Sequence, residues 1–403
     1  MKKSLLRPAL LSALLLGASH QGLAADPISA VDPGAKGAGD ARRQKNLADP
    51  APIGNTEITI ETIADGLTAP WCIAFLPNGD ILVSERPGRL RRISNGALTP
   101  EPIKGVPPVL ASGQGGLFDI LPHPDFSENS VVFLSYAHGT RRANALRIAR
   151  AVLNGDTLEN LEVIYEASPL KDTSLHFGGK LQIGGDGMLY ATTGEGSKYK
   201  ERAQDLSTSF GAVIRIAQDG TIPTDNPSFK EGALPEHFTK GHRNPQGLAY
   251  DPVRNILWEH EHGPRGGDEI NIIRAGENYG WPLASYGIDY NGALVTPYTE
   301  YQGTTQPFKY WTPSIATSGL AVYRGDLFPD DWDGDLLVGG LADRALHRVD
   351  LDGTEEVGEE RYLGDEDERI RDVRVGPDGA IYVATSADDS AATGRILRLT
   401  PAQ

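Results

Sequence analysis

Residues 76–83 read Leu76-Pro-Asn-Gly-Asp-Ile-Leu-Val83, a tight turn followed by a short apolar strand. Looser copies of this pattern stand further along the chain, at residues 123–134, 183–190, 250–258, 328–338 and 375–383. A basic, strand-like segment follows several of the copies, as at residues 88–93, 345–349 and 394–399. This repetition predicts an all-β fold, a six-bladed β-propeller with four-stranded blades and loop insertions of unequal length. A pair of β-sandwiches is the alternative, but it does not explain why one motif recurs in this way.

The rest of the chain supports a β fold and a single domain. Short runs of alternating apolar residues are bounded by turn residues, and no segment shows a long helical period. Because the blades of a propeller close into a ring, residues 57–403 are expected to form one domain. The ligand site is expected at one mouth of the central channel, where loops from several blades converge.

The N-terminus has the pattern of an export signal. Basic residues precede an apolar run from Ala9 to Leu16, and Gly22-Leu-Ala24 resembles a cleavage site, so residues 1–24 are predicted to be a signal peptide. Residues 25–56 are rich in Ala, Gly, Pro and Asp and are expected to be a flexible lead-in. The mature protein is therefore expected to be periplasmic or secreted, with no membrane span.

Charge and cysteine content narrow the classes of partner. The net charge of -16 argues against binding nucleic acid through the general electrostatic field. Solubility explains this acidity best, and the binding of cations or of a cationic redox partner is the alternative. Cys72 is the single cysteine, so no internal disulfide is expected.

Polar residues gather in three loop regions, at 175–181, 241–282 and 369–372, which suggests one pocket built from distant segments. Glu195 ends the strand that follows His176, so its carboxylate could lie beside the imidazole and make it a general base. A lone histidine is nevertheless more often structural than catalytic. Arg243 and Asn244 could contact an electron-rich oxygen, although a salt bridge between blades is an equally good reading of Arg243.

Two further features could bind charged ligands. Gly263 and Pro264 offer backbone carbonyls, and Asp268 and Glu269 add carboxylates, as in loops that bind calcium, although paired acids in loops are usually just solvated. Residues 369 and 371 are both arginines and alternate on a strand, so both side chains should point the same way. Two guanidinium groups on one face suit an anion that carries several carboxylates.

In combination, these segments resemble one known family. The runs Gln114-Gly-Gly-Leu, Leu175-His-Phe-Gly-Gly-Lys-Leu, Gly241-His-Arg-Asn-Pro-Gln-Gly, Glu261-His-Gly-Pro, Asp268-Glu-Ile-Asn, Asn278-Tyr-Gly-Trp-Pro and Arg369-Ile-Arg-Asp occur in the order seen in soluble quinoprotein glucose dehydrogenases and aldose sugar dehydrogenases. Members are six-bladed propellers that use pyrroloquinoline quinone (PQQ) and calcium. The short loop at residues 285–290 looks more like the aldose sugar dehydrogenase branch.

The resemblance implies a role for each polar residue. His176 would be the proton acceptor, with Glu195 as its partner and Arg243 and Asp268 in the catalytic group. The quinone would be contacted by Gln114, Arg243, Asn244, His262, Tyr290, Ala342, Arg369 and Arg371. Calcium would be held by Gly263 and Pro264, and a further calcium by Glu269 and the backbone of Tyr279. Ala342 stands where the glucose enzymes carry a lysine, His262 where they carry a glutamine, and Lys180 where an arginine is usual.

The implied reaction is the oxidation of an aldose at C1 to a lactone, with hydride transfer to the quinone and His176 as the base. A calcium-dependent propeller lactonase is the alternative enzyme, and a non-catalytic sugar- or protein-binding propeller is the alternative outside catalysis. The sugar preference, the electron acceptor (a quinone or a periplasmic redox protein) and the choice between monomer and homodimer stay open.

Overall fold

The computed structural model describes residues 50–386 and 393–402, which lie within one structural unit, residues 34–403. The predicted signal peptide and residues 25–49 of the predicted lead-in lie outside the described residues. Residues 50–56 lie beside strand β20 (Glu355–Tyr362). There the Gly54 N–H donates to the Arg361 carbonyl at 3.1 Å, and the Arg361 N–H donates to the Pro52 carbonyl at 2.9 Å.

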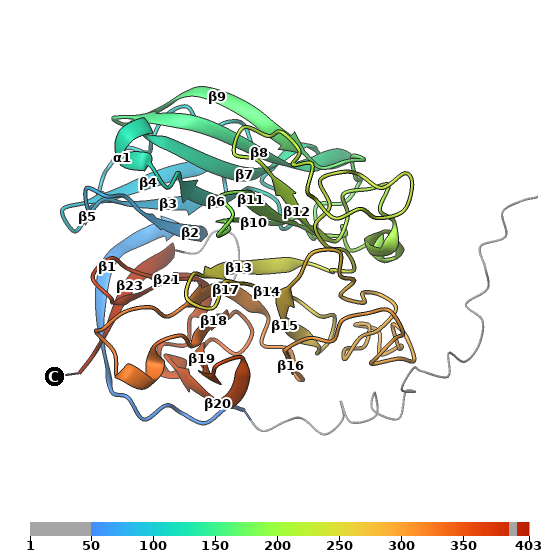
Figure 1. The fold of residues 1–403 in the computed structure, drawn as a ribbon. Helices are drawn as coiled ribbons and strands as arrows, with labels where there is room; N and C mark the ends of the chain where they lie inside the picture. The colour runs from blue at the N-terminus through green and yellow to red at the C-terminus, as the bar shows by residue number, and fades with distance from the viewer. Residues whose placement is uncertain (1–49, 387–392, 403) are drawn as a thin grey trace, which may run out of the picture. The chain divides into compact units, whose positions relative to one another are not determined.

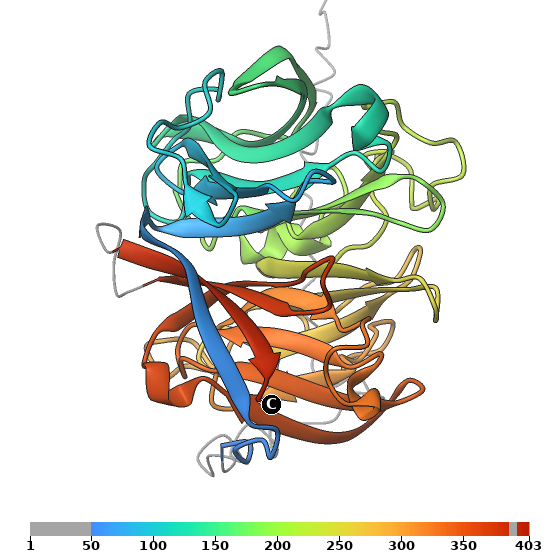
Figure 2. The same cartoon turned by 90° about the vertical axis from the view of Figure 1, so that its left-hand side faces the viewer.

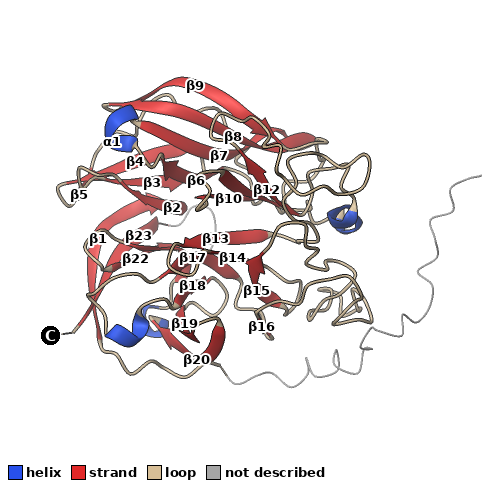
Figure 3. Cartoon of the chain, viewed as in Figure 1, coloured by secondary structure: helices blue, strands red, loops and turns tan. Residues whose placement is uncertain are grey.

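The regular secondary structure of the described chain is almost all β-strand, joined by many loops (Figures 1 and 3). Its strands are β1 (Ile58–Thr68), β2 (Pro70–Phe75), β3 (Ile81–Glu85), β4 (Arg89–Ser94), β5 (Ala97–Leu98), β6 (Leu117–Pro122), β7 (Val131–Thr140), β8 (Ala143–Asn154), β9 (Thr157–Glu166), β10 (Gly178–Ile183), β11 (Leu189–Thr193), β12 (Ala212–Ile216), β13 (Pro245–Asp251), β14 (Ile256–Glu261), β15 (Asp268–Ile273), β16 (Lys309–Trp311), β17 (Thr317–Val322), β18 (Leu336–Gly340), β19 (Leu346–Asp352), β20, β21 (Arg369–Val375), β22 (Ile381–Ser386) and β23 (Thr393–Pro401). The helices are single turns: α1 (Phe126–Asn129), η2 (Lys200–Gln204), η3 (Asp330–Trp332) and η4 (Gly364–Glu366). Among the described residues, no helix has the length and apolar character that crossing a bilayer requires.

These strands form six antiparallel sheets that follow one another around a ring, so the prediction of a six-bladed β-propeller is confirmed. The first strand of each sheet contacts the first strands of the two neighbouring sheets, in the order β2, β6, β10, β13, β17, β21 and back to β2. The N-terminal β1 is the outermost strand of the last sheet, where it pairs with the C-terminal β23 (Figure 2). The two ends of the described chain thus close the ring in one blade.

The recurring sequence motif is the turn between the first and second strands of each blade. In the first copy, the Leu76 N–H donates to the Asp80 carbonyl at 2.9 Å, and the Gly79 N–H donates to the Leu76 carbonyl at 3.0 Å. Gly79, Gly187 and Gly379 occupy the same place in three copies, with φ of 88°, 74° and 76°. Glycine has no Cβ to oppose this left-handed conformation, which explains why the turn recurs as a sequence signature.

The hydrophobic core is divided into layers between adjacent blades. Trp71 of β2 packs in one cluster with Phe118 of β6, and Phe133 of β7 packs in the next with Leu181 of β10. Further clusters fill the remaining blade-to-blade interfaces, including the one between the last blade and the first. Each sheet therefore buries apolar side chains on both faces, and its stability depends on both neighbours.

One blade departs from the predicted four strands. The described part of the third blade contains β10, β11 and β12, and the place of a fourth strand is taken by one isolated bridge between Ile214 and His237. The segment before that bridge contains Pro223, Pro227 and Pro235. Proline has no N–H to donate to a sheet, so this segment cannot extend the hydrogen-bond ladder as the outer strands of the other blades do.

Candidate active site

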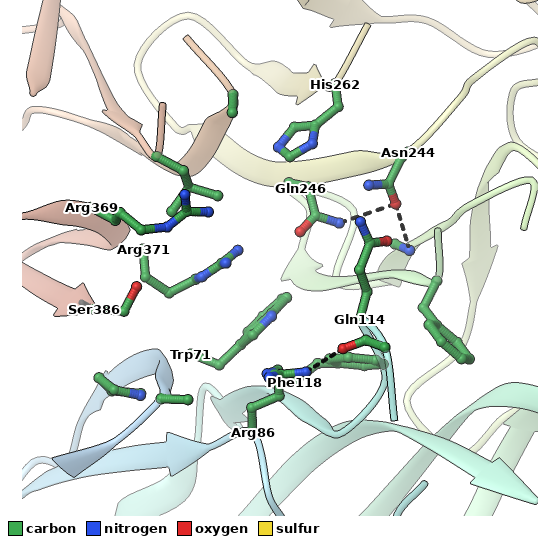
Figure 4. Close-up of a pocket in the computed structure, with 17 residues that line it drawn as sticks. Trp71, Arg86, Gln114, Phe118, Asn244, Gln246, His262, Arg369, Arg371 and Ser386 are labelled. Carbon is green, nitrogen blue, oxygen red and sulfur yellow. Dashed lines mark hydrogen bonds between the residues drawn. The ribbon is translucent and has the colours of Figure 1, made fainter. Parts of the chain in front are cut away.

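A cavity of about 550 Å³ opens at one end of the ring of first strands. Each blade contributes a residue at or just before the beginning of its first strand: Trp71, Phe118, Gly178, Gln246, Ala316 and Arg369. In Figure 4, Arg369 and Arg371 enter from one side, Asn244, Gln246 and His262 from the other, and Trp71 and Phe118 lie between them. This is the position at the channel mouth where the sequence predicts the ligand site.

A β-bulge at the cavity end of each first strand shapes this wall. The register of each first strand with the second strand of its blade shifts at this end, between Pro70 and Cys72 in β2 and between Ile370 and Asp372 in β21. The other four first strands carry comparable shifts. A bulge re-aims a side chain out of the regular alternation. Trp71 and Arg371, which stand at the two bulges named here, both line the cavity.

The cavity wall is cationic. Arg86, Arg369 and Arg371 line it, and the described lining residues include no aspartate or glutamate. Burial lowers the pKa of Arg371 to about 9, and the positive charges of Arg369 and Arg86 act in the same direction. Its Nη1 donates to the Ser318 hydroxyl at 3.2 Å. Because an anion would stabilise these guanidinium groups, the cavity favours a ligand with negative charges.

His176 lies beside this cavity, in the turn before β10. Its Nδ1 is 3.1 Å from Oε1 of Glu195, which follows β11, and both side chains are buried. Its backbone N–H donates to Oε1 of Gln114 at 2.7 Å. His176 lines a smaller cavity of about 10 Å³, and Phe177 lines both this cavity and the large one.

The environment keeps the His176 imidazole neutral near pH 7. Burial lowers its pKa, the hydrogen bond with Glu195 opposes this change, and the positive charges of Arg243 and Lys171 lower the pKa further. A neutral ring can accept a proton, and the carboxylate at Nδ1 fixes which nitrogen does so. The pair therefore has the chemistry of a general base and its orienting group.

Arg243 and Asn244 precede β13 and meet the loop after β14. Nη1 of Arg243 donates to the carbonyls of His262 and Gly263 at 3.1 and 2.7 Å, and its guanidinium lies 5.3 Å from the Trp281 ring centroid. Asn244 lines the large cavity, and its Oδ1 accepts the Gly178 N–H at 3.3 Å. The two residues thus connect the wall of the cavity to the loop that carries Gly263.

A second small cavity, also about 10 Å³, lies between the buried Glu261 and the partly buried Glu269. Its lining includes Glu261, Gly263, Glu269 and Tyr279. Burial raises the pKa of Glu269 well above its usual value, and the negative charge of Glu261 raises it further. Two acids around so small a space fit a cation, which would offset their mutual repulsion. Pro264 is buried in the same loop but is not among the described residues that line this space.

Asp268 fixes the loop that carries Gly263 through three hydrogen bonds. Its Oδ1 accepts the Gly263 N–H at 2.9 Å, and its Oδ2 accepts the Ser314 hydroxyl at 2.6 Å and the Ala316 N–H at 2.7 Å. Burial raises the pKa of Asp268 to about 6 against the effect of these hydrogen bonds. Its contacts with Gly263 and with Ala316, which lines the large cavity, connect the two cavities.

The structure brings most of the predicted cofactor residues together but not all of them. Gln114, Asn244, His262, Arg369 and Arg371 line the large cavity. Tyr290 and Ala342 are not among its described lining residues: the Tyr290 side chain is 74% exposed, and the exposed Ala342 donates its N–H to the Ile315 carbonyl at 2.9 Å. Leu341, next to Ala342, lines the cavity in its place.

Sequence reasoning missed several residues of the site. Arg86 and Gln246 line the large cavity, and His242 forms a buried cluster with Glu259 and Glu261. The alternation of Glu259 and Glu261 on a single strand was an available signal for that cluster, because residues two apart share one face. Arg86 gives no such signal, because it reaches the site only through the packing of the first blade against the second.

Comparisons with known proteins agree with this architecture. Residues 67–398 match the family model described as glucose / sorbosone dehydrogenase. The aldose sugar dehydrogenase YliI of Escherichia coli (strain K12) is 41% identical over 352 residues, which cover 85% of this chain and 93% of that protein.

Solved structures are similar along nearly the same length. The apo form of the soluble aldose sugar dehydrogenase from Escherichia coli has a TM-score of 0.81 and 40% identity, and the match covers 86% of this chain and all of that chain. The PQQ-bound form of an aldose sugar dehydrogenase from Streptomyces coelicolor has a TM-score of 0.69 and 29% identity, covering 87% of this chain and all of that chain. With a family match that spans all six blades, the chain belongs to the glucose / sorbosone dehydrogenase family.

Proposed function

We propose that this protein oxidises aldose sugars at C1 to lactones and transfers the hydride to PQQ bound together with calcium. The observation that carries the proposal is the cationic cavity beside the buried His176–Glu195 pair. The name of the Escherichia coli relative supports an aldose as the substrate, and the PQQ-bound neighbour supports the cofactor.

The described residues fit PQQ, a planar anion with three carboxylates. Arg369 and Arg371 would bind its carboxylates, and Gln114 and Asn244 would bind its polar edge. Trp71, Phe118 and Phe177 add aromatic surface to the same cavity, with ring centroids 5.4 Å apart for the first pair and 5.6 Å for the second. Aromatic rings of this kind favour a flat, conjugated ligand.

Calcium would bind in the loop after β14. Carbonyl oxygens of Gly263 and Pro264 would hold the ion that assists the cofactor, and Arg243 fixes the Gly263 carbonyl through Nη1. Glu269 and the backbone of Tyr279 would hold a further calcium in the small acidic cavity, with Glu261 beside them. Hard cations prefer these oxygen ligands.

The chain's own residues would supply binding and proton transfer. His176 would accept the proton of the anomeric hydroxyl at Nε2, because Nδ1 faces Glu195. Glu195 would stabilise the imidazolium that forms. Arg243 would stabilise the negative charge that develops on an oxygen of the bound cofactor. When bound, PQQ supplies the hydride acceptor. Asp268 would keep the Gly263 loop in place during the reaction.

The two alternative functions fit this site less well. A calcium-dependent lactonase needs carboxylate ligands in the channel mouth, whereas the described lining of the large cavity carries three arginines and no acid. A binding protein without catalysis needs no buried imidazole–carboxylate pair next to its ligand cavity. We further propose a periplasmic or secreted location, which the predicted signal peptide supports, and electron transfer to a quinone or a periplasmic redox protein.

The test is a titration of the purified apoprotein with PQQ and calcium, following dye reduction with a panel of aldoses. Activity that requires both additions is expected, and the panel would rank the sugars. Arg371→Gln should weaken PQQ binding by about 10-fold or more, because it removes one charge-assisted contact. Absence of activity, together with an unchanged PQQ spectrum, would overturn the proposal.

A further inference from the structure

Lys171 is a buried cation that the proposed mechanism does not use. Its side chain is 3% exposed. Its backbone is fixed to Asn144 at the beginning of β8 by two hydrogen bonds, of 2.8 and 2.9 Å. The ammonium group therefore extends into the protein interior from a backbone that these hydrogen bonds hold in place. It lines the small cavity that also contains His176.

The ammonium group of Lys171 holds the turn on which His176 stands. Nζ donates to the carbonyl of Leu175 and, at 3.0 Å, to the carbonyl of His176. It also lies 3.5 Å from the centroid of the Phe177 ring, a cation–π contact. Three consecutive residues of the turn thus contact one amino group.

This turn needs such support, because His176 has a φ of 43°. A residue with a Cβ is disfavoured in the left-handed region, and it stays there only when its surroundings determine the backbone. Gln114 accepts the N–H of His176, Gly196 donates to its carbonyl at 3.2 Å, and Lys171 donates to the same carbonyl. The left-handed turn directs the His176 ring toward Glu195, and Phe177 follows as part of the wall of the large cavity.

We propose that Lys171 is a positioning residue for His176: by binding the carbonyls of residues 175 and 176 and the face of Phe177, it keeps the imidazole in its place between Glu195 and the large cavity. The inference rests on the proposed function, because it takes His176 as the base. Lys171 itself does not touch the reacting atoms. Its role differs from that of Glu195, which holds the ring directly.

The charge of Lys171 also affects His176. The charged groups that face the imidazole are Glu195 after β11, Arg243 before β13 and Lys171 from the segment between β9 and β10. Burial lowers the pKa of Lys171 to about 7, while Glu195 opposes the change. Lys171 is therefore mostly charged in the acidic range where His176 takes up a proton, and this positive charge lowers the pKa of His176. Removing it should raise that pKa.

Two variants separate the hydrogen bonds of Lys171 from its charge. Lys171→Met keeps the apolar stem but removes the donors and the charge, whereas Lys171→Gln keeps an N–H donor on a side chain one atom shorter and removes the charge with its cation–π contact to Phe177. We expect Lys171→Met to lower kcat by about 10- to 100-fold, because a small misplacement of a catalytic group has effects of this size. Lys171→Gln should recover much of that loss at the optimum pH. Both variants should still bind PQQ, because Arg369 and Arg371 are unchanged, with a smaller loss of affinity than of kcat, since Lys171 also contacts Phe177 in the cavity wall.

A measurement without cofactor tests the same idea. The pKa of His176 can be followed by NMR in the apoprotein, with His176→Gln identifying its signal among the nine histidines of the chain. Both Lys171 variants should raise this pKa, and the acid limb of the kcat/KM profile should move to higher pH by the same amount. A merely structural role for Lys171 would lower the melting temperature and leave kcat of the folded variants at the wild-type value, whereas the shift of this pKa reports the charge of Lys171.

Lys309→Met is the matched control, because Lys309 is a lysine of another blade whose ammonium lies 2.5 Å from Glu356 and 2.8 Å from Glu359. This control variant should be less stable than the wild type and keep its kcat.

Lys171 variants with wild-type kcat and an unshifted His176 pKa would overturn the inference. If Lys171→Met does not fold, an unshifted pKa in Lys171→Gln would overturn it. A wild-type protein that oxidises no aldose would instead overturn the proposed function, while the apoprotein measurement would still decide whether Lys171 acts on His176.

Discussion

At the scale of single residues, the site depends on one buried carboxylate. Glu195 is 1% exposed, and its Oε2 has no hydrogen-bond partner among the described residues, so its charge acts mainly on His176 through Oε1. A buried charge is costly in free energy unless nearby groups compensate it. The groups near this one are the His176 imidazole and the Lys171 ammonium, whose pKa Glu195 raises, so the charge acts on the proposed base and on the residue that holds it.

Glu195→Gln should therefore lower activity and change its pH dependence. The glutamine keeps the volume and an oxygen for Nδ1, but the loss of the negative charge lowers the pKa of His176. We expect kcat to fall by about 10- to 100-fold and the acid limb of the kcat/KM profile to move to lower pH, opposite to the shift expected for Lys171→Met. Steady-state rates between about pH 4 and pH 9 measure both effects, because this range brackets the ordinary histidine pKa of about 6.5. Glu162→Gln, in an exposed ion pair with Arg150, is the control.

A second histidine should affect stability instead of catalysis. His347 lies between Asp343 at 2.6 Å and Glu359 at 2.7 Å. Burial lowers its pKa, but the two carboxylates outweigh burial and raise the pKa to about 9. A pKa raised by folding stabilises the protein below the unfolded pKa of about 6.5, and this contribution is lost as the pH rises through the folded value.

The free energy of unfolding of the wild type should thus decrease between about pH 6.5 and pH 9, by up to about 3 kcal/mol from this group. His347→Gln should be less stable at pH 6 and should lose less stability over the same interval. Urea unfolding of both proteins at the two pH values measures the difference. Parallel pH curves for the two proteins would show that His347 does not carry this dependence.

At the scale of single elements, the β-bulges connect the fold to the site. The bulge in β17 contains Gly319, with a φ of 65°. A Cβ at this position would lie 2.5 Å from the backbone nitrogen of Val373 and 2.6 Å from Cα of Asp372, both in β21. The neighbouring Ser318 accepts a hydrogen bond from Arg371. Two adjacent first strands therefore approach closely at the cavity, and only glycine allows it.

Gly319→Ala should consequently lower the free energy of unfolding by several kcal/mol, because backbone strain and overpacking each cost about 1–3 kcal/mol. It should also weaken PQQ binding, because it would displace the strand that carries Arg371. Gly353→Ala is a matched control, because Gly353 has a φ of 64° but no atom within 4 Å of the added Cβ. The control should cost about 1 kcal/mol and leave PQQ affinity unchanged. Chemical unfolding and absorbance titration separate the two effects, and equal losses in both variants would remove the steric argument.

The blades were predictable from the sequence because their turns are local. Gly79 and its counterparts impose the turn within a few residues, so the repeat is visible without any long-range contact. The proximity of His176 and Glu195 was predictable for the same reason, since one hairpin joins them. The bulge at Arg371 and the arrival of Arg86 at the cavity depend on how one blade packs against another. No local pattern encodes that packing.

At the scale of the whole molecule, ring closure makes the ends of the described chain essential. β1 and β23 pair from Ile58 with Pro401 to Thr68 with Thr393. Ala64 and Leu67 of β1 also pack in the cluster between the last and first blades. The cavity receives residues from both of these blades, Trp71 from the first and Arg371 from the last. Opening the ring should therefore disturb the site as well as the fold.

A chain shortened to begin at residue 69, which lacks β1, should unfold at a lower temperature and bind PQQ weakly, because β23 becomes an unpaired edge and the last interface loses apolar contacts. A chain that begins at residue 57 keeps β1 and, of the contacts that the structure describes, loses those of residues 50–56 with β20, so it should bind PQQ normally. Thermal unfolding and PQQ titration of the two shortened proteins compare these outcomes directly. If both bind PQQ equally well, closure by β1 is not required for the site, and the contacts among the first strands are sufficient to hold the cavity together.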